Sequence, residues 1–397
     1  MLYRRFGKTE LQLPVLTLGG MRFVNGWAGP HDVLPDETLQ NVHEVAHHAL
    51  DVGINHFETA RDYGKSERAY GKIWSQLKQS TETKSQLRER IIFTTKIAPM
   101  PTYEKMRSAI DDSLERLQID VIDNFDIHGI NNEEKYARTF QKNGCLKAVE
   151  DAMNEGLIKH LGFSTHGDLA LILKLIDSDV FESVNLHYYY FFQRNLPAVL
   201  RAAEKDMGVF IISPNDKGGQ LFTPPQKLIR LTTPLSPMNF NDRFCLSHPE
   251  IHTLSLGADQ PKQIDSHLSS LYSDITADAK PNSSFGQIKS RVDWEAAALQ
   301  RQGKQYCTIC YDCLPCPETI NIPEVLRFRN MWKAYDMETF ATYRYNMLEA
   351  HSDWFPGQFA HKCTECGDCL PRCPEQLPIP QFLFETHHRF YKSQKKQ

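Results

Sequence analysis

The chain has 397 residues, of which 41% are hydrophobic and 24% are charged, so it can bury ordinary globular cores. Its length favours two domains, and its formal net charge of −4 gives no reason to expect a nucleic acid as a partner. No apolar run approaches the roughly 20 residues of a membrane span, so we expect a cytoplasmic protein with no membrane partner.

Residues 1–275 alternate strand-like and helix-like stretches, a pattern that is typical of a parallel α/β domain. The strand candidates are short apolar or β-branched runs, namely Val15–Met21, Ile54–Thr59, Ile91–Ile97, Val121–His128, His160–Ser164, Ser183–Tyr188, Gly208–Ser213 and Ile251–Gly257. Most of the helix candidates begin at small polar or acidic residues. The candidates are Asp36–Val52, Ser66–Lys78, Thr102–Leu117, Leu146–Asn154, Asp168–Ile176, Asn195–Lys205 and Pro261–Leu271.

Eight strands with intervening helices predict a closed (β/α)8 barrel, and Arg4 to Pro14 is expected to form a hairpin that closes its floor. A doubly wound open sheet is the alternative. That fold would need a glycine-rich phosphate fingerprint after the first strand, and Leu18-Gly19-Gly20-Met21 does not provide one.

In such a barrel the site forms at the C-terminal ends of the strands. Strand two ends with Glu58 and is followed by Tyr63, strand three carries Lys96, and strand four ends at His128. Taken singly, each could be a packing or solvated residue. Together, an ammonium that lowers the tyrosine pKa, a carboxylate that holds the lysine and a histidine that orients a carbonyl predict a proton-donating site.

Eight of the ten cysteines lie in two runs near the C-terminus. The second run has the C-x2-C-x2-C-x3-C-P spacing of bacterial ferredoxins, and the first is one residue shorter before its last cysteine. In this pattern the fourth cysteine of each run binds the other cluster. We therefore predict two [4Fe–4S] clusters, one held by Cys307, Cys310, Cys313 and Cys373, the other by Cys363, Cys366, Cys369 and Cys316.

Zinc and disulfides are the other interpretations of these cysteines. Zinc takes four ligands, fewer than two runs of four supply, and disulfides need an oxidising compartment. The polar stretch Asp274–Phe285 contains a proline and indicates a linker. We expect a barrel at 1–275, a linker at 276–292 and a small ferredoxin-like domain at 293–397, with helical spacing across Ile322–Ala350.

At these residues the chain resembles the aldo-keto reductases. The resemblance is carried by Tyr3–Thr9, Gly53–Gly64, Lys96, His128, Gly162–Thr165 and Ile212–Pro214. The C-terminal part resembles the branch of that family with a fused dicluster ferredoxin domain. The family implies hydride transfer from a nicotinamide at the barrel mouth to a carbonyl carbon. It implies Tyr63 as general acid, Lys96 as the residue that modifies its pKa, and His128 as the substrate-orienting group, with Glu58 where aspartate is usual.

The resemblance also implies a set of cofactor-binding residues. These are Ser164, Thr165 and Asn185 for the nicotinamide, Ser213, Gly218, Gly219 and Leu221 for the pyrophosphate, and Gly257, Lys262 and Gln263 for the adenosine phosphate. Asp259 would repel a 2′-phosphate and Lys262 would attract it, so NADP(H) and NAD(H) both stay open.

The leading hypothesis is an iron–sulfur aldo-keto reductase that reduces a small carbonyl compound. A cluster passes single electrons whereas a hydride carries two, so the alternative is a ferredoxin-linked oxidoreductase that uses single-electron steps with a ferredoxin or another electron-transfer protein as its partner. The third hypothesis is a catalytically silent redox-sensing protein, since Glu58, Thr165, Asn185 and Ile212 depart from the family pattern.

Overall fold

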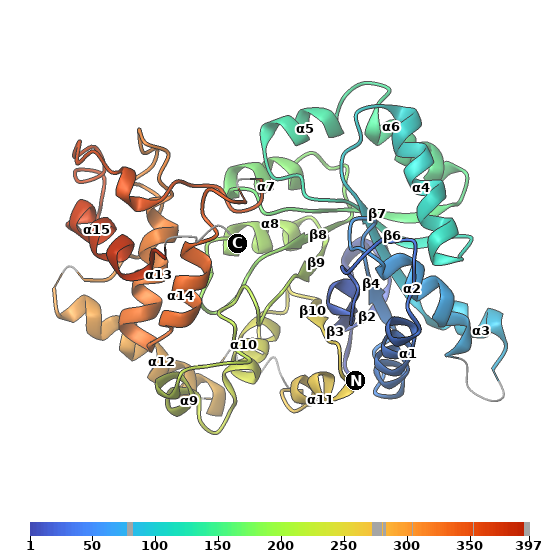
Figure 1. The fold of residues 1–397 in the computed structure, drawn as a ribbon, viewed down its shortest axis with the longest axis horizontal. Helices are drawn as coiled ribbons and strands as arrows, with labels where there is room; N and C mark the ends of the chain where they lie inside the picture. Colours follow the sequence, from blue (N-terminus) through green and yellow to red (C-terminus); the bar gives the residue numbers. More distant parts are fainter. Residues whose placement is uncertain (78–81, 272–279, 281–282, 304, 352, 393–397) are drawn as a thin grey trace. The chain divides into compact units, whose positions relative to one another are not determined.

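The computed structural model describes residues 1–77, 82–271, 280, 283–303, 305–351 and 353–392. Parallel strands close into a barrel in the order β10-β3-β4-β5-β6-β7-β8-β9 (Figure 1). The strands are β3 Leu16–Gly19, β4 His56–Glu58, β5 Ile92–Ile97, β6 Ile122–Ile127, β7 Ile158–Ser164, β8 Ser183–Leu186, β9 Gly208–Ile211 and β10 Thr253–Gly257. The predicted barrel is confirmed, and each predicted strand run contains or overlaps one of these strands.

The predicted N-terminal hairpin is also present. β1 (Tyr3–Arg5) pairs antiparallel with β2 (Gln12–Pro14) around the 3-10 turn η1 (Gly7–Thr9). Phe6 and Leu13 of the hairpin form one apolar cluster with Phe210 of β9. Gly7 has a φ of +55°, and a Cβ there would collide with backbone atoms at the start of β9, so this close approach requires glycine.

Helices surround the barrel because each carries an apolar stripe at helical spacing. In α1 the buried residues include Val42, Val45, Ala46 and Ala49, and the helix ends just before Gly53, whose φ is +88°. The predicted helices correspond to α1 Asp36–Asp51, α2 Ser66–Ile73 with η3 Trp74–Gln76, α4 Tyr103–Leu117, α6 Cys145–Asn154, α7 Leu169–Ile176, α8 Leu196–Glu204 and α11 Pro261–Leu268. Lys78, the last residue of one predicted helix, lies outside the described residues.

Within residues 82–246, four further helices lie in stretches for which the sequence predicted none. They are α3 Lys84–Arg90, α5 Glu133–Thr139, α9 Gln226–Thr232 and α10 Pro237–Leu246. Three of them are only seven residues long, too short for a clear helical period. No helix in the described part of the chain is both long and apolar enough to cross a membrane.

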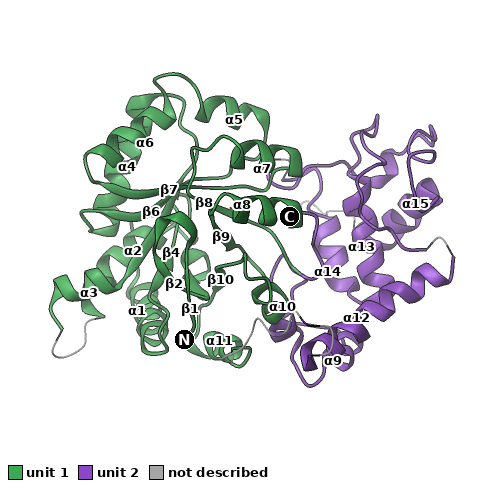
Figure 2. Cartoon of the chain, turned by 180° about the vertical axis from the view of Figure 1, so that it is seen from behind, with its two compact units in different colours: residues 1–189, 195–214, 242–276 green, residues 190–194, 215–241, 277–397 purple. Residues whose placement is uncertain are grey.

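The chain divides into two units, which Figure 2 shows in different colours. The first holds the barrel, at residues 1–189, 195–214 and 242–276. The second holds residues 277–397 together with 190–194 and 215–241, which follow β8 and β9. The sequence placed these two short segments in the barrel domain, whereas the structure assigns them to the second unit.

The second unit is helical, as predicted. Its C-terminal elements are α12 Ser284–Arg301, α13 Ile322–Tyr335, α14 Glu338–Tyr345, the 3-10 turn η5 Ala360–Lys362 and α15 Ile379–Phe390. The predicted linker 276–292 is wrong from residue 284 onward, because α12 begins there, and most of its earlier part lies outside the described residues. Ser283 caps α12, and Phe285, Ile288 and Val292 bury one face of the helix. The polar composition of this stretch led the sequence analysis to predict a linker in place of this helix.

Candidate active site and cluster sites

The end of the barrel interior holds a buried ion pair. Glu58, the last residue of β4, contacts Lys96 of the neighbouring strand β5 through its carboxylate. Lys96 is fully buried, and its Nζ also donates a hydrogen bond of 2.8 Å to the carbonyl oxygen of Thr59. Ser255 of β10 donates to the other carboxylate oxygen of Glu58 at 3.2 Å. Each partner is thus held by a second contact, which favours a fixed geometry.

Tyr63 and His128 lie beside this pair, so the four predicted catalytic residues converge. Lys96 Nζ lies 4.9 Å from the centroid of the Tyr63 ring. The Tyr63 and His128 rings meet edge to face, with centroids 5.6 Å apart and planes at 80°. Both rings are partly exposed, whereas Glu58 and Lys96 are buried. A molecule at the barrel mouth could therefore reach the tyrosine and the histidine, with the ion pair behind them.

Asp126 is a further member of this group that the sequence patterns did not reveal. It lies on β6 directly opposite Lys96 in the strand register and is 1% exposed. Asn124 donates a hydrogen bond of 3.0 Å to Asp126 Oδ1. Asn124, Asp126 and His128 are two residues apart, so they face the same side of the sheet. This alternation ending at His128 is the signal that could have identified Asp126.

The buried charges shift one another's pKa values. Burial lowers the pKa of Lys96 to about 7, and the nearby Asp126 opposes this shift. Burial also raises the pKa of Asp126 to about 6, and Lys96 opposes that shift. The ammonium of Lys96 therefore interacts with two buried carboxylates, those of Glu58 and Asp126, and the titrations of these groups are coupled.

The expected lowering of the Tyr63 pKa is wrong for this arrangement. Burial raises the pKa of Tyr63 above its ordinary value of 10, and the charges of Asp126 and Asp62 raise it further. The positive charge of Lys96 is compensated by the carboxylate of Glu58, and burial lowers the pKa of Lys96, so this ammonium does not offset these effects. Tyr63 therefore keeps its proton throughout the neutral pH range.

Ser164 and Asn185 offer polar groups that fit a nicotinamide carboxamide. They are paired residues on β7 and β8, and both are buried. Ser164 Oγ accepts a hydrogen bond from the Gly129 backbone at 2.9 Å, and its own O–H can donate. Asn185 lies near enough to Asp126 to lower the pKa of that carboxyl, yet among the described residues no protein atom completes a well-aligned hydrogen bond with either polar atom of its amide. A buried amide without such a bond is costly unless a bound group satisfies it.

The other predicted cofactor-binding residues follow strand ends of the barrel or belong to the second unit. The Thr165 hydroxyl donates to the Ile130 carbonyl at 2.6 Å and accepts from Gly167, so it holds the loop between strand ends. Ser213 follows β9 with a φ of +50°. Gly218, Gly219 and Leu221 belong to the second unit, where a Cβ on Gly219 would lie 2.5 Å from Met337.

The predicted adenosine-phosphate residues lie at the end of β10 and the start of α11. Lys262 is exposed, and Gln263 accepts a hydrogen bond of 2.8 Å from the Asp259 backbone. The side chain of Arg22 packs over Gly257, where a Cβ would lie 2.7 Å from Arg22 Cγ. A second cation thus lies near this strand end, which the sequence did not suggest.

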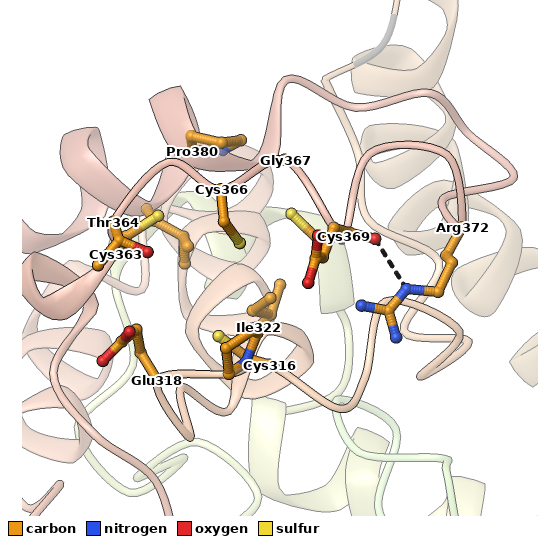
Figure 3. Close-up of a pocket in the computed structure, with 13 residues that line it drawn as sticks. Cys316, Glu318, Ile322, Cys363, Thr364, Cys366, Gly367, Cys369, Arg372 and Pro380 are labelled. Atoms are coloured by element: carbon orange, nitrogen blue, oxygen red, sulfur yellow. Dashed lines mark hydrogen bonds between the residues drawn. The ribbon is translucent and has the colours of Figure 1, made fainter.

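In the second unit the eight clustered cysteines line two cavities, of about 350 and 300 Å³ including their open mouths. The larger is lined by Cys316, Cys363, Cys366 and Cys369, whose side chains surround one space in Figure 3. The smaller is lined by Cys307, Cys310, Cys313 and Cys373. Each cavity thus combines three cysteines of one run with the last cysteine of the other, the same grouping that the spacing predicts.

The two cysteine runs share a backbone conformation that fits a cluster. The second and fourth residues after the first cysteine are left-handed in both, Ile309 and Tyr311 in one run and Glu365 and Gly367 in the other, with φ between +56° and +81°. Such a conformation is unusual for a β-branched residue such as Ile309. Alternating handedness turns successive N–H groups inward, which suits an anionic group. The Ile309 N–H, for example, donates to Cys307 Sγ at 3.4 Å.

The described residues contain no group of three or more His, Cys, Asp or Glu side chains arranged to hold a single metal ion. Cysteines that surround a cavity fit a four-iron cluster better, because each iron of the cluster takes one thiolate at a separate corner. Burial raises the pKa of Cys307 to about 11 and that of Cys313 to about 12, so assembly of a cluster would release protons.

Comparison with known proteins agrees with these observations. The family model described as "Aldo/keto reductase family" matches residues 15–223, and one described as "4Fe-4S dicluster domain" matches residues 306–378. The 6-dehydroglucose reductase of Novosphingobium aromaticivorans is 30% identical over 169 residues, which are 41% of this chain and 51% of that protein. The L-glyceraldehyde 3-phosphate reductase of Escherichia coli is 25% identical over 179 residues, 42% of this chain and 46% of that protein. The chain thus spans about half the length of these two relatives.

Among solved structures, an aldo-keto reductase from Bacillus halodurans in its holo form superposes with a TM-score of 0.58. The two chains are 20% identical, and the match covers 73% of this chain and 96% of the other. This likeness supports the barrel fold. Since the aldo/keto reductase model alone matches more than half of the sequence, the chain belongs to the aldo/keto reductase family, and it carries a C-terminal 4Fe–4S dicluster domain.

Proposed function

We propose that the barrel reduces the carbonyl group of a small molecule with a nicotinamide dinucleotide, NADP(H) or NAD(H), as its cofactor. The observation that carries this proposal is the convergence of Glu58, Lys96, Tyr63 and His128 at one end of the barrel. When bound, the nicotinamide supplies a hydride to the carbonyl carbon. Ser164 and Asn185 would hold its carboxamide, because both present buried polar groups that such an amide can satisfy.

Tyr63 is the proposed general acid. As hydride reaches the carbonyl carbon, the substrate oxygen becomes an alkoxide, the Tyr63 O–H bond breaks and a new O–H bond forms on the substrate. An alkoxide is a stronger base than a phenolate, so even a tyrosine with a raised pKa can donate to it. His128, edge-on to Tyr63, would hold the substrate oxygen in line. Lys96 would then return a proton to the phenolate.

The substrate class is proposed from the two relatives. Their names refer to a glucose-derived carbonyl compound and to glyceraldehyde 3-phosphate, so hydroxylated aldehydes are the first compounds to test. The eight cysteines of the two runs are free thiols, which suits the reducing setting of the cytoplasm.

The test is the variant Tyr63→Phe on anaerobically purified protein. We expect kcat/KM for aldehyde reduction to fall by about 10² to 10⁴, because the phenyl ring keeps the shape and loses only the proton. Tyr136→Phe, on α5, is the matched control. Oxidation of NADPH or NADH by a panel of hydroxy-aldehydes provides the assay. Full turnover by Tyr63→Phe would show that the acid is another group.

A second candidate function is supported by the two cysteine cavities and the matching dicluster model. In it the clusters exchange single electrons with a ferredoxin or a similar redox protein, and the barrel reduces its substrate in one-electron steps. This candidate differs from the first in whether the clusters change oxidation state during turnover.

A further inference from the structure

Asp126 gives this barrel a second buried carboxylate beside Lys96. The residue is 1% exposed, and its position opposite Lys96 in the β5–β6 register places it inside the barrel. Its carboxylate lies over Gly162 of β7, where a Cβ would collide with Asp126 Oδ1 and with Ser183 Oγ. A glycine on one neighbouring strand and an amide donor from Asn124 therefore make room for this carboxylate and hold it.

The charges around Asp126 do not balance if every group is ionised. Lys96 of β5 and Asn185 of β8 act directly on Asp126, and Asp126 in turn acts on Tyr63 in the turn after β4. Glu58 and His56 of β4 interact with Lys96. Burial and the charge of Lys96 lower the pKa of His56 to about 3, so His56 is neutral. Lys96 is then the cation for two carboxylates. Since Glu58 is in contact with Lys96 and with Ser255, Asp126 is the carboxylate that can take up a proton at least cost.

We propose that Asp126 is a positioning residue for proton supply, which keeps a transferable proton on Lys96 for return to Tyr63. The inference rests on the proposed carbonyl reduction. After Tyr63 has protonated the substrate oxygen, an N–H bond of Lys96 breaks and the O–H bond of Tyr63 forms again. The amine left behind takes its next proton from solvent. Without Asp126, one carboxylate alone would oppose the burial of the ammonium, and Lys96 would be neutral over more of the working pH range.

Relative proton affinities support this order of transfer. The pKa of Tyr63 is raised above 10 while that of Lys96 is near 7, so a proton passes from the ammonium to the phenolate in the favourable direction. Asp126 raises the pKa of Lys96, and it therefore decides how much of the lysine is charged near neutral pH. It acts through Lys96 and does not need to touch the substrate.

The experiment is Asp126→Asn in the full-length, cluster-loaded protein, because asparagine keeps the shape and removes the charge. Asp62→Asn is the matched control, since Asp62 is an exposed carboxylate next to Tyr63. Lysine labelled with ¹³C at Cε is titrated by NMR, with the Lys96 signal assigned through Lys96→Met. We expect the Lys96 midpoint at a clearly lower pH in Asp126→Asn and unchanged in Asp62→Asn. Infrared difference spectra should contain a buried carboxylic acid band that titrates near pH 6 and is lost only in Asp126→Asn.

Neither readout needs a substrate, so they test the inference even if carbonyl reduction is not found. With an active protein, the alkaline limb of the kcat profile should move to lower pH in Asp126→Asn, because proton return follows the chemical step, with a loss of several-fold at pH 8 and little change at pH 6. An unchanged Lys96 midpoint, or a wild-type spectrum without the carboxylic acid band, would overturn the proposal. A shifted midpoint with an unshifted kinetic limb would overturn the link to proton return.

Discussion

Glu58 and Asp126 are carboxylates near the same lysine, yet we expect their removal to have opposite effects on stability. Glu58 is in direct contact with Lys96, so Glu58→Gln leaves a buried ammonium without its closest partner. Breaking a buried pair on one side costs about 3–5 kcal/mol. Asp126 has a raised pKa, so the folded state binds its proton more tightly than the unfolded state. Its contribution is favourable below about pH 4 and is lost as the pH rises through about 6.

At neutral pH, Asp126→Asn should therefore stabilise the barrel by up to about 3 kcal/mol, the equivalent of the pKa difference, whereas Glu58→Gln should destabilise it. Hydrogen exchange of peptides from β4, β5 and β6 measures the change in stability of the barrel separately from that of the second unit. The gain in Asp126→Asn should shrink as the pH is lowered from 6 to 4. A loss of protection in Asp126→Asn at pH 7 would contradict this ordering.

At the scale of elements, the two cysteine runs act as one interlocked unit. Each cavity takes its fourth cysteine from the other run, so the clusters cannot be assigned by neighbourhood in the sequence. We expect Cys373→Ser to lower iron from about eight to about four atoms per chain, the content of one remaining cluster. Adding Cys307→Ser, whose side chain lines the same cavity, should remove little more. Adding Cys363→Ser, a neighbour in the sequence but in the other cavity, should remove both clusters.

Iron and sulfide counts with electron paramagnetic resonance of the dithionite-reduced protein give the answer, and circular dichroism verifies that each variant is folded. If the double variant with Cys363→Ser kept one cluster while that with Cys307→Ser lost both, each run would bind its own cluster. The left-handed backbone at Ile309, Tyr311 and Glu365 also belongs to this scale, because such strain persists only where surrounding contacts fix it.

At the scale of the whole molecule, the chain joins an aldo/keto reductase barrel to a 4Fe–4S dicluster domain. The chemistry proposed for the barrel moves two electrons as a hydride, whereas a cluster passes single electrons. A nicotinamide does not readily divide its electron pair without a flavin or a similar relay. We therefore expect NADPH or NADH alone to leave the clusters oxidised under anaerobic conditions, and dithionite to reduce them. Resonance spectra recorded after each addition measure this. A reduced-cluster signal with NADPH alone, or reoxidation of reduced clusters by an aldehyde, would favour the second candidate function.

The sequence alone predicted the barrel and the cysteine pattern of a dicluster domain, both of which are confirmed, and it proposed a set of catalytic residues. These predictions rest on local patterns, which can be identified from the order of neighbouring residues alone. The patterns are the cysteine spacings, the alternation of strand and helix, and the polar residues at successive strand ends. The sequence did not predict the short helices α3, α5 and α9, because seven residues are too few to show a helical period.

Only the tertiary structure decided which groups face one another. Asp126 reads as an ordinary strand residue until β5 and β6 pair and bring it opposite Lys96. The tertiary structure also overturned the expected lowering of the Tyr63 pKa, because burial raises this pKa and the charges of Asp126 and Asp62 raise it further. The assignment of residues 190–194 and 215–241 to the second unit likewise depends on contacts far apart in the chain. Electrostatic energy depends on the distance between charges and on their burial, and the amino-acid sequence by itself gives neither quantity.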